Sequence, residues 1–339
     1  MQTPPYFLDA VFLGCLSIET IINRKKEIFI ERLGGNLLYA ASAAKIWGTT
    51  SGLLSKVGGY YSESFIKQIT DRGLNTQGII RTGSELDHHD FYFVADNGNL
   101  VIDNPHKYFL ELDQPIPKSL LGYSRNGSKL DSKRSCGDLS FKPEDIPSEY
   151  FDCRNLALCP YDYISHSLVP VEFRSRNNTR VFFHAANGYM HSSFFTEIPA
   201  LVCGAELFFT TYQCARDLFL GKLEDLWEML EFIASFNIET SVIHKPGDGF
   251  YVFVQRTNQK YYLPEYPVEL VDPVGVEDAF FGGFVAHYLK NFDPVKAAAA
   301  GAVSASIKSE GSTPSYLLNT LPELAFSRME KLMDEIASR

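Results

Sequence analysis

Short apolar runs that suit buried strands alternate along the chain with segments that have the spacing of amphipathic or Ala-rich helices. Gly48 and Gly73, each directly after a helical segment, are typical helix-stop signals. Strands are predicted at Ala10–Leu13, Ser51–Val57, Thr76–Arg81, Leu156–Leu158, Val181–His184, Leu207–Thr210 and Ser241–His244. Helices are predicted at Leu37–Trp47, Ser62–Arg72 and Leu223–Phe236, with a helix or turn around Ile164–Arg174 and a last helix at Pro294–Lys308. This alternation predicts an α/β fold, a three-layer α/β/α sandwich around a mainly parallel, doubly wound sheet.

A different pattern, that of a hairpin, occupies the region after residue 88. Phe91–Val94 and Leu100–Ile102 flank Asn97-Gly98, a turn dipeptide that accepts positive φ. Together with the alternating segment Ile28–Ile30, this hairpin predicts a small β-sheet outside the main one, a lid built from about 18–33 and 88–113. A second hairpin is predicted over Phe250–Tyr262.

The residues 122–145 are polar and rich in turn formers, which is typical of an exposed insertion rather than a domain boundary. With 339 residues, 45% of them apolar, the chain can bury the core of one large α/β domain, residues 1–339. We therefore expect one large α/β unit with an appended small sheet and one surface insertion, without an internal repeat.

Composition and charge exclude several function classes. The net charge of −10 argues against a nucleic-acid or anionic-membrane partner. No stretch approaches about 18 uninterrupted apolar residues, the length that spans a bilayer. The N-terminal residues lack the basic and apolar regions of a signal peptide, so we expect a cytoplasmic protein. The six cysteines form no C-x-x-C pair and are interpreted as free, mostly buried thiols.

The stretch with most chemical information is Asp272–Gly283, a Gly-containing turn between a strand-like approach and an apolar helical pattern. The first N–H groups of a helix have no intrahelical acceptor and lie at the positive end of the dipole, so they attract phosphate. An Asp in such a turn repels the ligand, unless it removes a proton from a hydroxyl that then attacks phosphorus. Asp278 is the candidate for this base. The alternative is a helix N-terminus with an ordinary acidic first turn.

Two motifs together resemble the ribokinase-like, or PfkB, family of carbohydrate and nucleoside kinases. The first is Gly34-Gly35 with the Ala-rich helix to Gly48, followed by Leu53-Leu54-Ser55-Lys56-Val57-Gly58 and Arg72-Gly73-Leu74-Asn75-Thr76. The second is Asp272–Gly283, which is similar to the family's D-T-T-G-A-G-D-A-F-x-G-G. The order of the motifs and the trailing Ala-rich helix also agree, so the resemblance covers nearly the whole chain.

The resemblance implies a role for each matching position. Asp278 is expected to be the catalytic base, and the backbone of Gly275, Val276 and Glu277 the anion hole for the transferred phosphoryl group. Substrate binding is expected at Glu19, Gly34, Gly35, Asn36 and Tyr39, and nucleotide binding at Thr211, Gly247, Gly249 and Asp272. The family implies ATP with Mg²⁺, a monovalent cation such as K⁺ beside the anion hole, a sugar or nucleoside acceptor, and a homodimer through the lid. It leaves the metal ligands unidentified.

The site also departs from the family pattern. Glu19 replaces an Asp that binds sugar hydroxyls, and Tyr39 replaces an Asn. The family's N-x-x-E, which organises water and Mg²⁺, aligns with Thr211–Cys214, where no carboxylate remains; Asp217 or Glu206 is a candidate substitute.

Pro246 replaces the first Gly of the nucleotide-side pattern, and Glu277 replaces the last Gly of G-A-G-D. The Glu277 carboxylate either lies beside the phosphate path or points away as a helix N-terminal acid.

Further polar groups have open interpretations. His88-His89-Asp90 looks like a metal cluster but is interpreted as a surface or lid contact, and Phe91-Tyr92-Phe93 as lid core rather than a stacking platform. Asn187 follows a strand at the side of the sheet where α/β proteins bind ligands, so it is a candidate phosphate or sugar contact.

Two functions compete. The first is ATP-dependent phosphorylation of a hydroxyl of a sugar, sugar-like or nucleoside substrate. The second is a ribokinase-fold ligand-binding protein with little or no kinase activity, which the missing N-x-x-E and Glu277 favour. A Rossmann dehydrogenase ranks third, because no G-x-G-x-x-G follows the first strand.

Overall fold

A nine-stranded sheet forms the centre of the computed structural model, which describes residues 7–125 and 130–337. From one edge to the other its strands are β13 (Gln259–Pro264), β12 (Gly249–Val254), β11 (Thr240–Lys245), β10 (Leu207–Thr211), β9 (Arg180–His184), β8 (Asn155–Leu158), β1 (Ala10–Leu13), β4 (Ser51–Val57) and β5 (Asn75–Arg81). All neighbours from β11 to β5 are parallel, whereas β12 and β13 pair antiparallel. Strand order reverses at β1, which lies between β8 and β4, as a doubly wound sheet requires.

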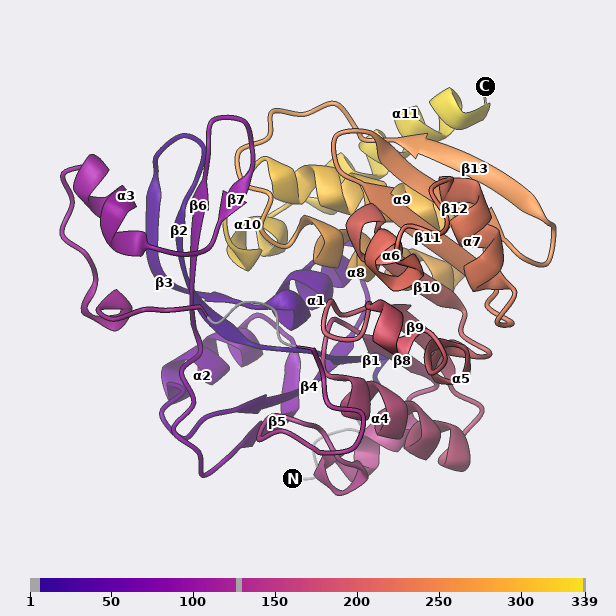
Figure 1. The fold of residues 1–339 in the computed structure, drawn as a ribbon, viewed down its shortest axis with the longest axis horizontal. Helices are drawn as coiled ribbons and strands as arrows, with labels where there is room; N and C mark the ends of the chain where they lie inside the picture. Colours follow the sequence, from indigo (N-terminus) through magenta and orange to yellow (C-terminus); the bar gives the residue numbers. More distant parts are fainter. Residues whose placement is uncertain (1–6, 126–129, 338–339) are drawn as a thin grey trace.

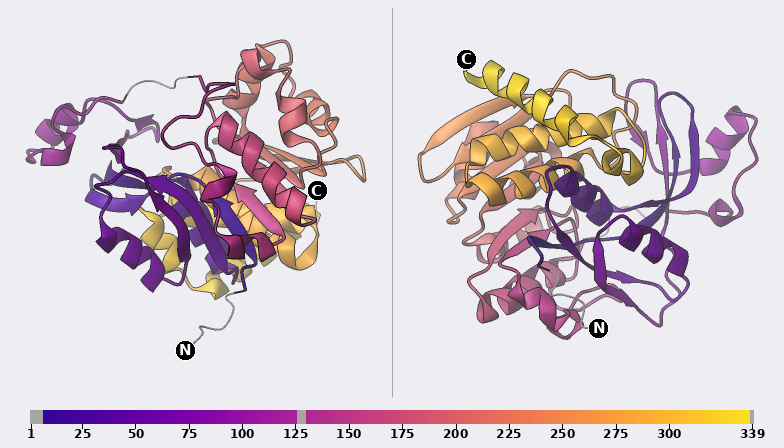
Figure 2. Two further views of the ribbon diagram at one scale, coloured as in Figure 1. Left: turned by 90° about the horizontal axis from the view of Figure 1, so that it is seen from below. Right: turned by 180° about the vertical axis from the view of Figure 1, so that it is seen from behind.

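Helices cover both faces of this sheet (Figures 1 and 2). Alternate residues of each strand enter opposite layers: Phe12 belongs to one core cluster and Leu13 to the other. The Phe12 layer holds α1 (Asn36–Ile46), α2 (Glu63–Asp71), α8 (Val276–Asn291), α9 (Pro294–Ser309), α10 (Pro314–Leu318) and α11 (Pro322–Ala337). The Leu13 layer holds α4 (Tyr163–Arg176), α5 (Ile198–Val202), α6 (Tyr212–Phe219) and α7 (Leu226–Ala234). The predicted three-layer α/β/α architecture is therefore confirmed.

A second, four-stranded sheet stands beside the main one (Figure 1). Its order is β3 (Ile28–Gly34), β2 (Ser17–Ile22), β6 (His89–Val94) and β7 (Leu100–Val101), and α3 (Pro105–Glu111) packs against it. Ile22, Phe91, Phe109 and Leu120 form its separate core. The small sheet expected from the hairpin pattern exists, and Phe91 is part of its core.

The sequence prediction was wrong in two places. The helix at Pro294–Lys308 is not the last, because α10 and α11 follow it. The segment 122–145 is not exposed throughout: Phe141 is fully buried, and its N–H donates to Ser165 Oγ at 2.7 Å. The ring of Phe141 and the partly buried Leu139 pack into the Leu13 layer, whereas residues 126–129 lie outside the described part.

Several smaller features complete the inventory. Helix α3, α5 and α6 had no counterpart among the predicted helices, and short 3-10 helices occur at Lys118–Leu120, Pro143–Asp145, Ser148–Asp152 and Ser192–Phe194. The six cysteines are free as predicted, although only Cys153, Cys159 and Cys214 are buried. Among the described residues, none of the helices combines the length and apolar character needed to cross a membrane.

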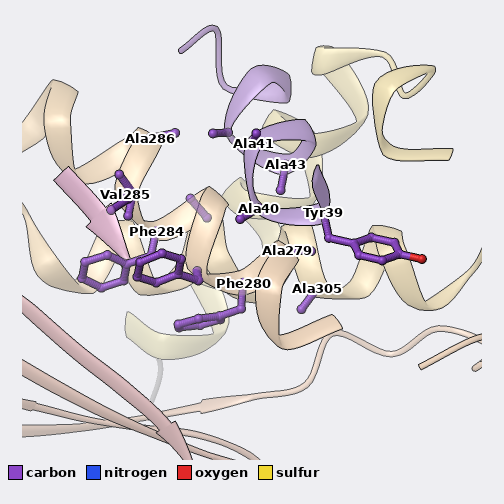
Figure 3. Close-up of a cluster of buried hydrophobic side chains, with 14 of the residues drawn as sticks. Tyr39, Ala40, Ala41, Ala43, Ala279, Phe280, Phe284, Val285, Ala286 and Ala305 are labelled. Atoms are coloured by element: carbon purple, nitrogen blue, oxygen red, sulfur yellow. The ribbon is translucent and has the colours of Figure 1, made fainter. Parts of the chain in front are cut away.

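Helix α1 packs tightly against α8, and Figure 3 shows the alanines of α1 above Ala279, Phe280 and Phe284 of α8. Gly282 sits where a Cβ would overlap the backbone carbonyl of Ala40. Backbone atoms cannot move aside as a flexible side chain can. The Ala-rich sequence of α1 and the glycine in α8 thus set the distance between the two helices, and with it the position of the α8 N-terminus.

Replacement of Gly282 by alanine should therefore destabilise the protein. We expect Gly282→Ala to lower the free energy of unfolding by about 3 kcal/mol, because overpacking outweighs the gain in helix propensity. Gly83→Ala is the matched control: no atom lies within 4 Å of its added Cβ, so the change should stay within about 0.5 kcal/mol. Urea unfolding of both variants measures the difference, and equal midpoints would show that the helix contact does not limit packing.

Candidate active site

The turn before α8 is held from behind by Asp272. This residue is fully buried, and its Oδ1 accepts from the Val274 N–H at 2.9 Å. Gly275, the residue before the helix, has φ of 76° and ψ of 13°, in the left-handed region that favours glycine. A Cβ on Gly275 would also overlap the ring of Tyr39. The Asp272 carboxylate therefore fixes the turn, and the Tyr39 ring fixes the start of α8.

The helix start presents free donors. The Val276 N–H donates to Pro273 O at 3.3 Å, and the Ala279 N–H donates to Gly275 O at 2.9 Å. Within the described residues, the N–H groups of Gly275 and Asp278 have no such backbone acceptor. These donors lie at the positive end of a 16-residue helix, which is the arrangement that binds anions.

Asp278 lies at a cavity of about 900 Å³, called here the Asp278 cavity. Its side chain is 15% exposed, and Oδ1 lies 3.2 Å from Nδ1 of His184, the last residue of β9. The carboxyl end of a parallel strand and the start of a helix thus bring a carboxylate and an imidazole together. Further polar lining comes from Asn36, Asn187, His191, Thr211, Gln213 and Asp217.

A second, more enclosed cavity of about 340 Å³, the His244 cavity, lies on the other side of Glu277. Apart from His244 and Glu265, its walls are mostly apolar and include Phe250, Tyr266, Val268, Leu270, Val276 and Ala302. Glu277 lines both cavities. One carboxylate at the start of α8 therefore separates a polar cavity from an apolar one.

The charge of Glu277 is compensated by His244. His244 Nδ1 lies 3.4 Å from Glu277 Oε1, and its Nε2 lies 3.0 Å from Glu265 Oε1. Burial lowers the pKa of His244, but the contacts with Glu265 and Glu277 outweigh it and raise the pKa to about 9. Burial raises the pKa of Glu277, but the same contact with His244 lowers it overall. Near neutral pH an imidazolium thus bridges two carboxylates, so Glu277 neither points away nor lies unpaired beside the phosphate path.

Glu19 is enclosed rather than open to a ligand. It is 1% exposed and accepts from the Tyr39 OH at 2.7 Å and the Gly35 N–H at 2.8 Å. Gly34 is pressed against it, because a Cβ there would overlap the Glu19 carboxylate. Burial raises the pKa of Glu19 to about 7, although three donors, including Ser17 Oγ, favour the ionised form. Neither Glu19 nor Tyr39 lines the two cavities described above.

The other predicted site residues are spread over the two cavities and the scaffold. Thr211 and Asn36 line the Asp278 cavity; Thr211 caps α6, and Asn36 Nδ2 donates to Pro160 O. Gly247 lines the His244 cavity, and its N–H donates to Glu265 Oε1 at 2.9 Å. Gly249 begins β12 and lines neither cavity, and Asp272 lies behind the turn.

The insertion reaches the site. Leu130 lines the Asp278 cavity, and the Asp131 N–H donates to Gly188 O at 2.9 Å. The Asp131 carboxylate accepts from the Tyr163 N–H at 2.9 Å, which ties this segment to the start of α4. No local pattern predicts this contact, because it depends on how a polar stretch folds back over the sheet edge.

Few carboxylates near the Asp278 cavity could bind a divalent metal ion. Among the described residues, no group of three His, Cys, Asp or Glu side chains could hold a metal ion by itself. Asp217 lines the Asp278 cavity, whereas Glu206 contacts Tyr288 OH and Arg180 at the opposite end of β10. Mg²⁺ is usually held by one or two carboxylates together with substrate phosphates. Asp217 and Glu277 are therefore the oxygen ligands that fit a Mg²⁺ ion arriving with a nucleotide.

Sequence reasoning missed two partners in the site. His184 was noted only for its place after a strand, and its contact with Asp278 was not predicted. Glu265, the second partner of His244, was not predicted at all. A His at a strand end and an acid at a helix start are visible in the sequence, but their pairing depends on the strand order. The segment His88–Asp90, interpreted from sequence as a surface or lid contact, makes a structural contact: His88 Nε2 accepts from the Gly58 N–H at 2.7 Å.

Comparisons with known proteins agree with this fold. Residues 187–319, which contain the turn and α8, match the sequence model of the pfkB family carbohydrate kinase. A curated relative, the cytidine kinase of Thermococcus kodakarensis, is 22% identical over 284 residues, which cover 83% of this chain and 88% of the relative.

Solved structures are also similar. The ribokinase of Thermotoga maritima has a TM-score of 0.64 at 16% identity and covers 96% of this chain and 100% of its own. A fructokinase double mutant from Vibrio cholerae O395, with fructose, ADP and potassium ion bound, has a TM-score of 0.67 at 15% identity, with 95% and 98% of the two chains covered. The fold is ribokinase-like. The family match and the curated relative show that the chain is similar to ribokinase-like kinases of the PfkB family.

The bridged His244 makes stability depend on pH. Its pKa is raised from 6.5 to about 9, so its contribution is complete below 6.5 and is lost as the pH rises through about 9. We expect the stability advantage of the wild type over His244→Gln to decrease by on the order of 3 kcal/mol between pH 6.5 and 10. Exposed His106→Gln is the control and should show no such trend. Urea unfolding across this range checks it, and a difference independent of pH would refute the bridge.

Proposed function

We propose that the chain is an ATP-dependent phosphotransferase that phosphorylates a hydroxyl of a sugar, sugar-like or nucleoside substrate. The observation that carries this proposal is Asp278, a carboxylate at a cavity wall in the first turn of a helix, where the N–H groups of Gly275 and Asp278 have no backbone acceptor. Its relatives are sugar and nucleoside kinases, which supports the same reaction class.

In this mechanism the Asp278 carboxylate takes the proton of the acceptor hydroxyl. The hydroxyl oxygen then forms a bond to the γ-phosphorus of ATP, while the bond from that phosphorus to the β,γ-bridging oxygen breaks and ADP leaves. The helix-start N–H groups of Gly275, Val276 and Glu277 stabilise the negative charge on the phosphoryl oxygens. His184, 3.2 Å from Asp278 Oδ1, orients the base. Asp217 and Glu277 would hold Mg²⁺ that arrives with ATP, and the ion would supply electrostatic stabilisation of the phosphates.

The two cavities divide the substrates. The apolar His244 cavity suits the base and ribose of the nucleotide, with Gly247 in its wall, and the polar Asp278 cavity suits the phosphates beside Thr211. Gly34, Gly35 and Asn36 are proposed to face the acceptor under the small sheet, with Glu19 and Tyr39 as a rigid wall behind them. Asp272 is proposed to contribute to nucleotide binding indirectly, because it holds the turn before α8 in place.

The small sheet is proposed to act as the lid over the acceptor and as a homodimer contact, in a cytoplasmic enzyme of one domain. Exposed apolar side chains on and next to this sheet support the contact; they are Ile30, Leu100, Ile102 and Leu110.

Asp278→Asn tests the base directly. The amide cannot accept the proton, so we expect kcat to decrease by about a thousandfold or more, with the melting temperature nearly unchanged. Asp225→Asn is the matched control: Asp225 caps α7 far from the site, and Asn caps equally well. Coupled ADP-release assays with a panel of pentoses, hexoses and nucleosides provide the rates. Near-normal turnover of Asp278→Asn would remove Asp278 from the mechanism.

The second candidate is a ligand-binding protein with little or no kinase activity. Two observations favour it: Glu19 is closed off by Tyr39 and Gly35, and the family's metal-organising Glu is replaced by Cys214, whose Sγ donates to Asn187 Oδ1. In this alternative, the site keeps the helix start for anion binding but has lost part of the metal and acceptor contacts.

Glu277→Gly discriminates between the two functions. In a working kinase it should lower kcat by about tenfold or more, because Mg²⁺ loses a ligand and His244 loses a partner. In a decayed site, restoration of the glycine should raise turnover instead. Glu265→Gln is the control, since it removes the other partner of His244 while leaving the helix start intact. The same coupled assay reports both variants, and a gain for Glu277→Gly would favour the binding protein.

A further inference from the structure

A lysine side chain lies fully buried beside the turn of the proposed anion hole. Lys308, in the last turn of α9, has no exposed surface. Its Nζ donates to Gly311 O at 2.8 Å and to Asp272 O at 3.2 Å, and lies 3.3 Å from Asp272 Oδ2. The three N–H donors of the ammonium therefore face three oxygen atoms. Two carbonyls and a carboxylate are also the kind of oxygen set that replaces the hydration shell of a monovalent cation.

The charge is enclosed on every side. Nζ lies 5.4 Å from the centre of the Tyr39 ring, which provides a cation–π contact, and Glu19 acts on the ammonium at longer range. Apart from the ammonium, Asp272 Oδ2 has no hydrogen-bond partner among the described residues. The lysine and the aspartate are each the main charge partner of the other.

The ammonium is linked to the helix start through few atoms. Asp272 accepts from Lys308 at one end and from the Val274 N–H at the other, one residue before Gly275. The Val271 and Asp272 N–H groups both donate to Ser309 O, so the end of α9 also holds the turn. Tyr39 packs on Gly275 and faces Lys308. Any loss of the positive charge would leave a buried carboxylate unpaired directly behind the donors that bind phosphate.

A potassium ion does not fit beside this turn, because the oxygen atoms that would bind it are already occupied by the ammonium. We propose that Lys308 is a positioning residue that replaces the monovalent cation of related kinases, such as the fructokinase solved with potassium ion, and makes the site independent of K⁺. Only the activity part of this inference rests on the proposed function. The structural part concerns how the turn is held, with or without catalysis.

The test uses Lys308→Ala, which removes the charge and leaves space for an ion, and Lys308→Met, which removes the charge but fills the space. Melting temperatures are measured in KCl, NH₄Cl and choline chloride at equal ionic strength. The wild type should change by less than about 1 °C among the salts. Lys308→Ala should melt lower in choline chloride and regain roughly 3 to 5 °C in 100 mM KCl or NH₄Cl, by mass action. Lys308→Met should be destabilised without recovery in any salt.

Several outcomes would overturn the proposal. A wild type that K⁺ stabilises would show an open cation site elsewhere, and Lys308→Ala without recovery would show a purely structural ion pair. If Lys308→Ala does not fold even in KCl, this also contradicts the proposal that Lys308 takes the place of a monovalent cation.

The activity part separates this inference from the proposed function. The wild-type kcat should agree within about twofold between K⁺ and choline, whereas Lys308→Ala should be activated about tenfold or more by K⁺. An inactive wild type refutes the kinase while the melting data still decide the role of Lys308. An active, K⁺-stimulated wild type refutes the inference and leaves the kinase in place.

Discussion

The close contact between α1 and α8 is the constraint on which the site depends. Gly282 against the Ala40 carbonyl leaves no freedom in the distance between the two helices, and two turns earlier Gly275 lies against the ring of Tyr39. Because both contacts join α1 to α8 or to the residue before it, the packing of the core also sets where α8 begins and where its free N–H groups point. The donors that would bind phosphate are placed by ordinary helix packing, without a dedicated loop.

Around that helix start, the buried carboxylates of Asp272 and Glu277 each have an opposite charge nearby. Lys308 faces Asp272 behind the turn, and His244 stands between Glu277 and Glu265 in front of it. Unpaired charges in such surroundings are strongly destabilising, so each pair constrains the position of the other. Glu277, which looked like an obstacle to phosphate binding, therefore belongs to a compensated set. The enclosure of Glu19 by Tyr39 and Gly35 follows the same rule with hydrogen bonds in place of an ion pair.

Much of the fold could be predicted from sequence, because its signals are local. Ser51–Val57 and Ala10–Leu13 are strands with the predicted bounds, since short apolar runs next to Gly have few other solutions in a buried sheet. The terminal helix α11 was overlooked, although its apolar residues recur at helical spacing. Phe141 could not be placed, because one aromatic residue in a polar stretch does not reveal which surface it reaches.

By itself, the sequence determined the family resemblance, the helix start at Gly275 and the candidate base Asp278, since these depend on neighbours in the chain. The tertiary structure decided which charged side chains are neighbours. His184 lies beside Asp278, His244 lies between Glu265 and Glu277, and Lys308 lies beside Asp272. Each of these pairs joins elements far apart in sequence, brought together by strand order and helix packing. Electrostatic partners act through space over a few ångströms, and no local pattern in a chain records that distance.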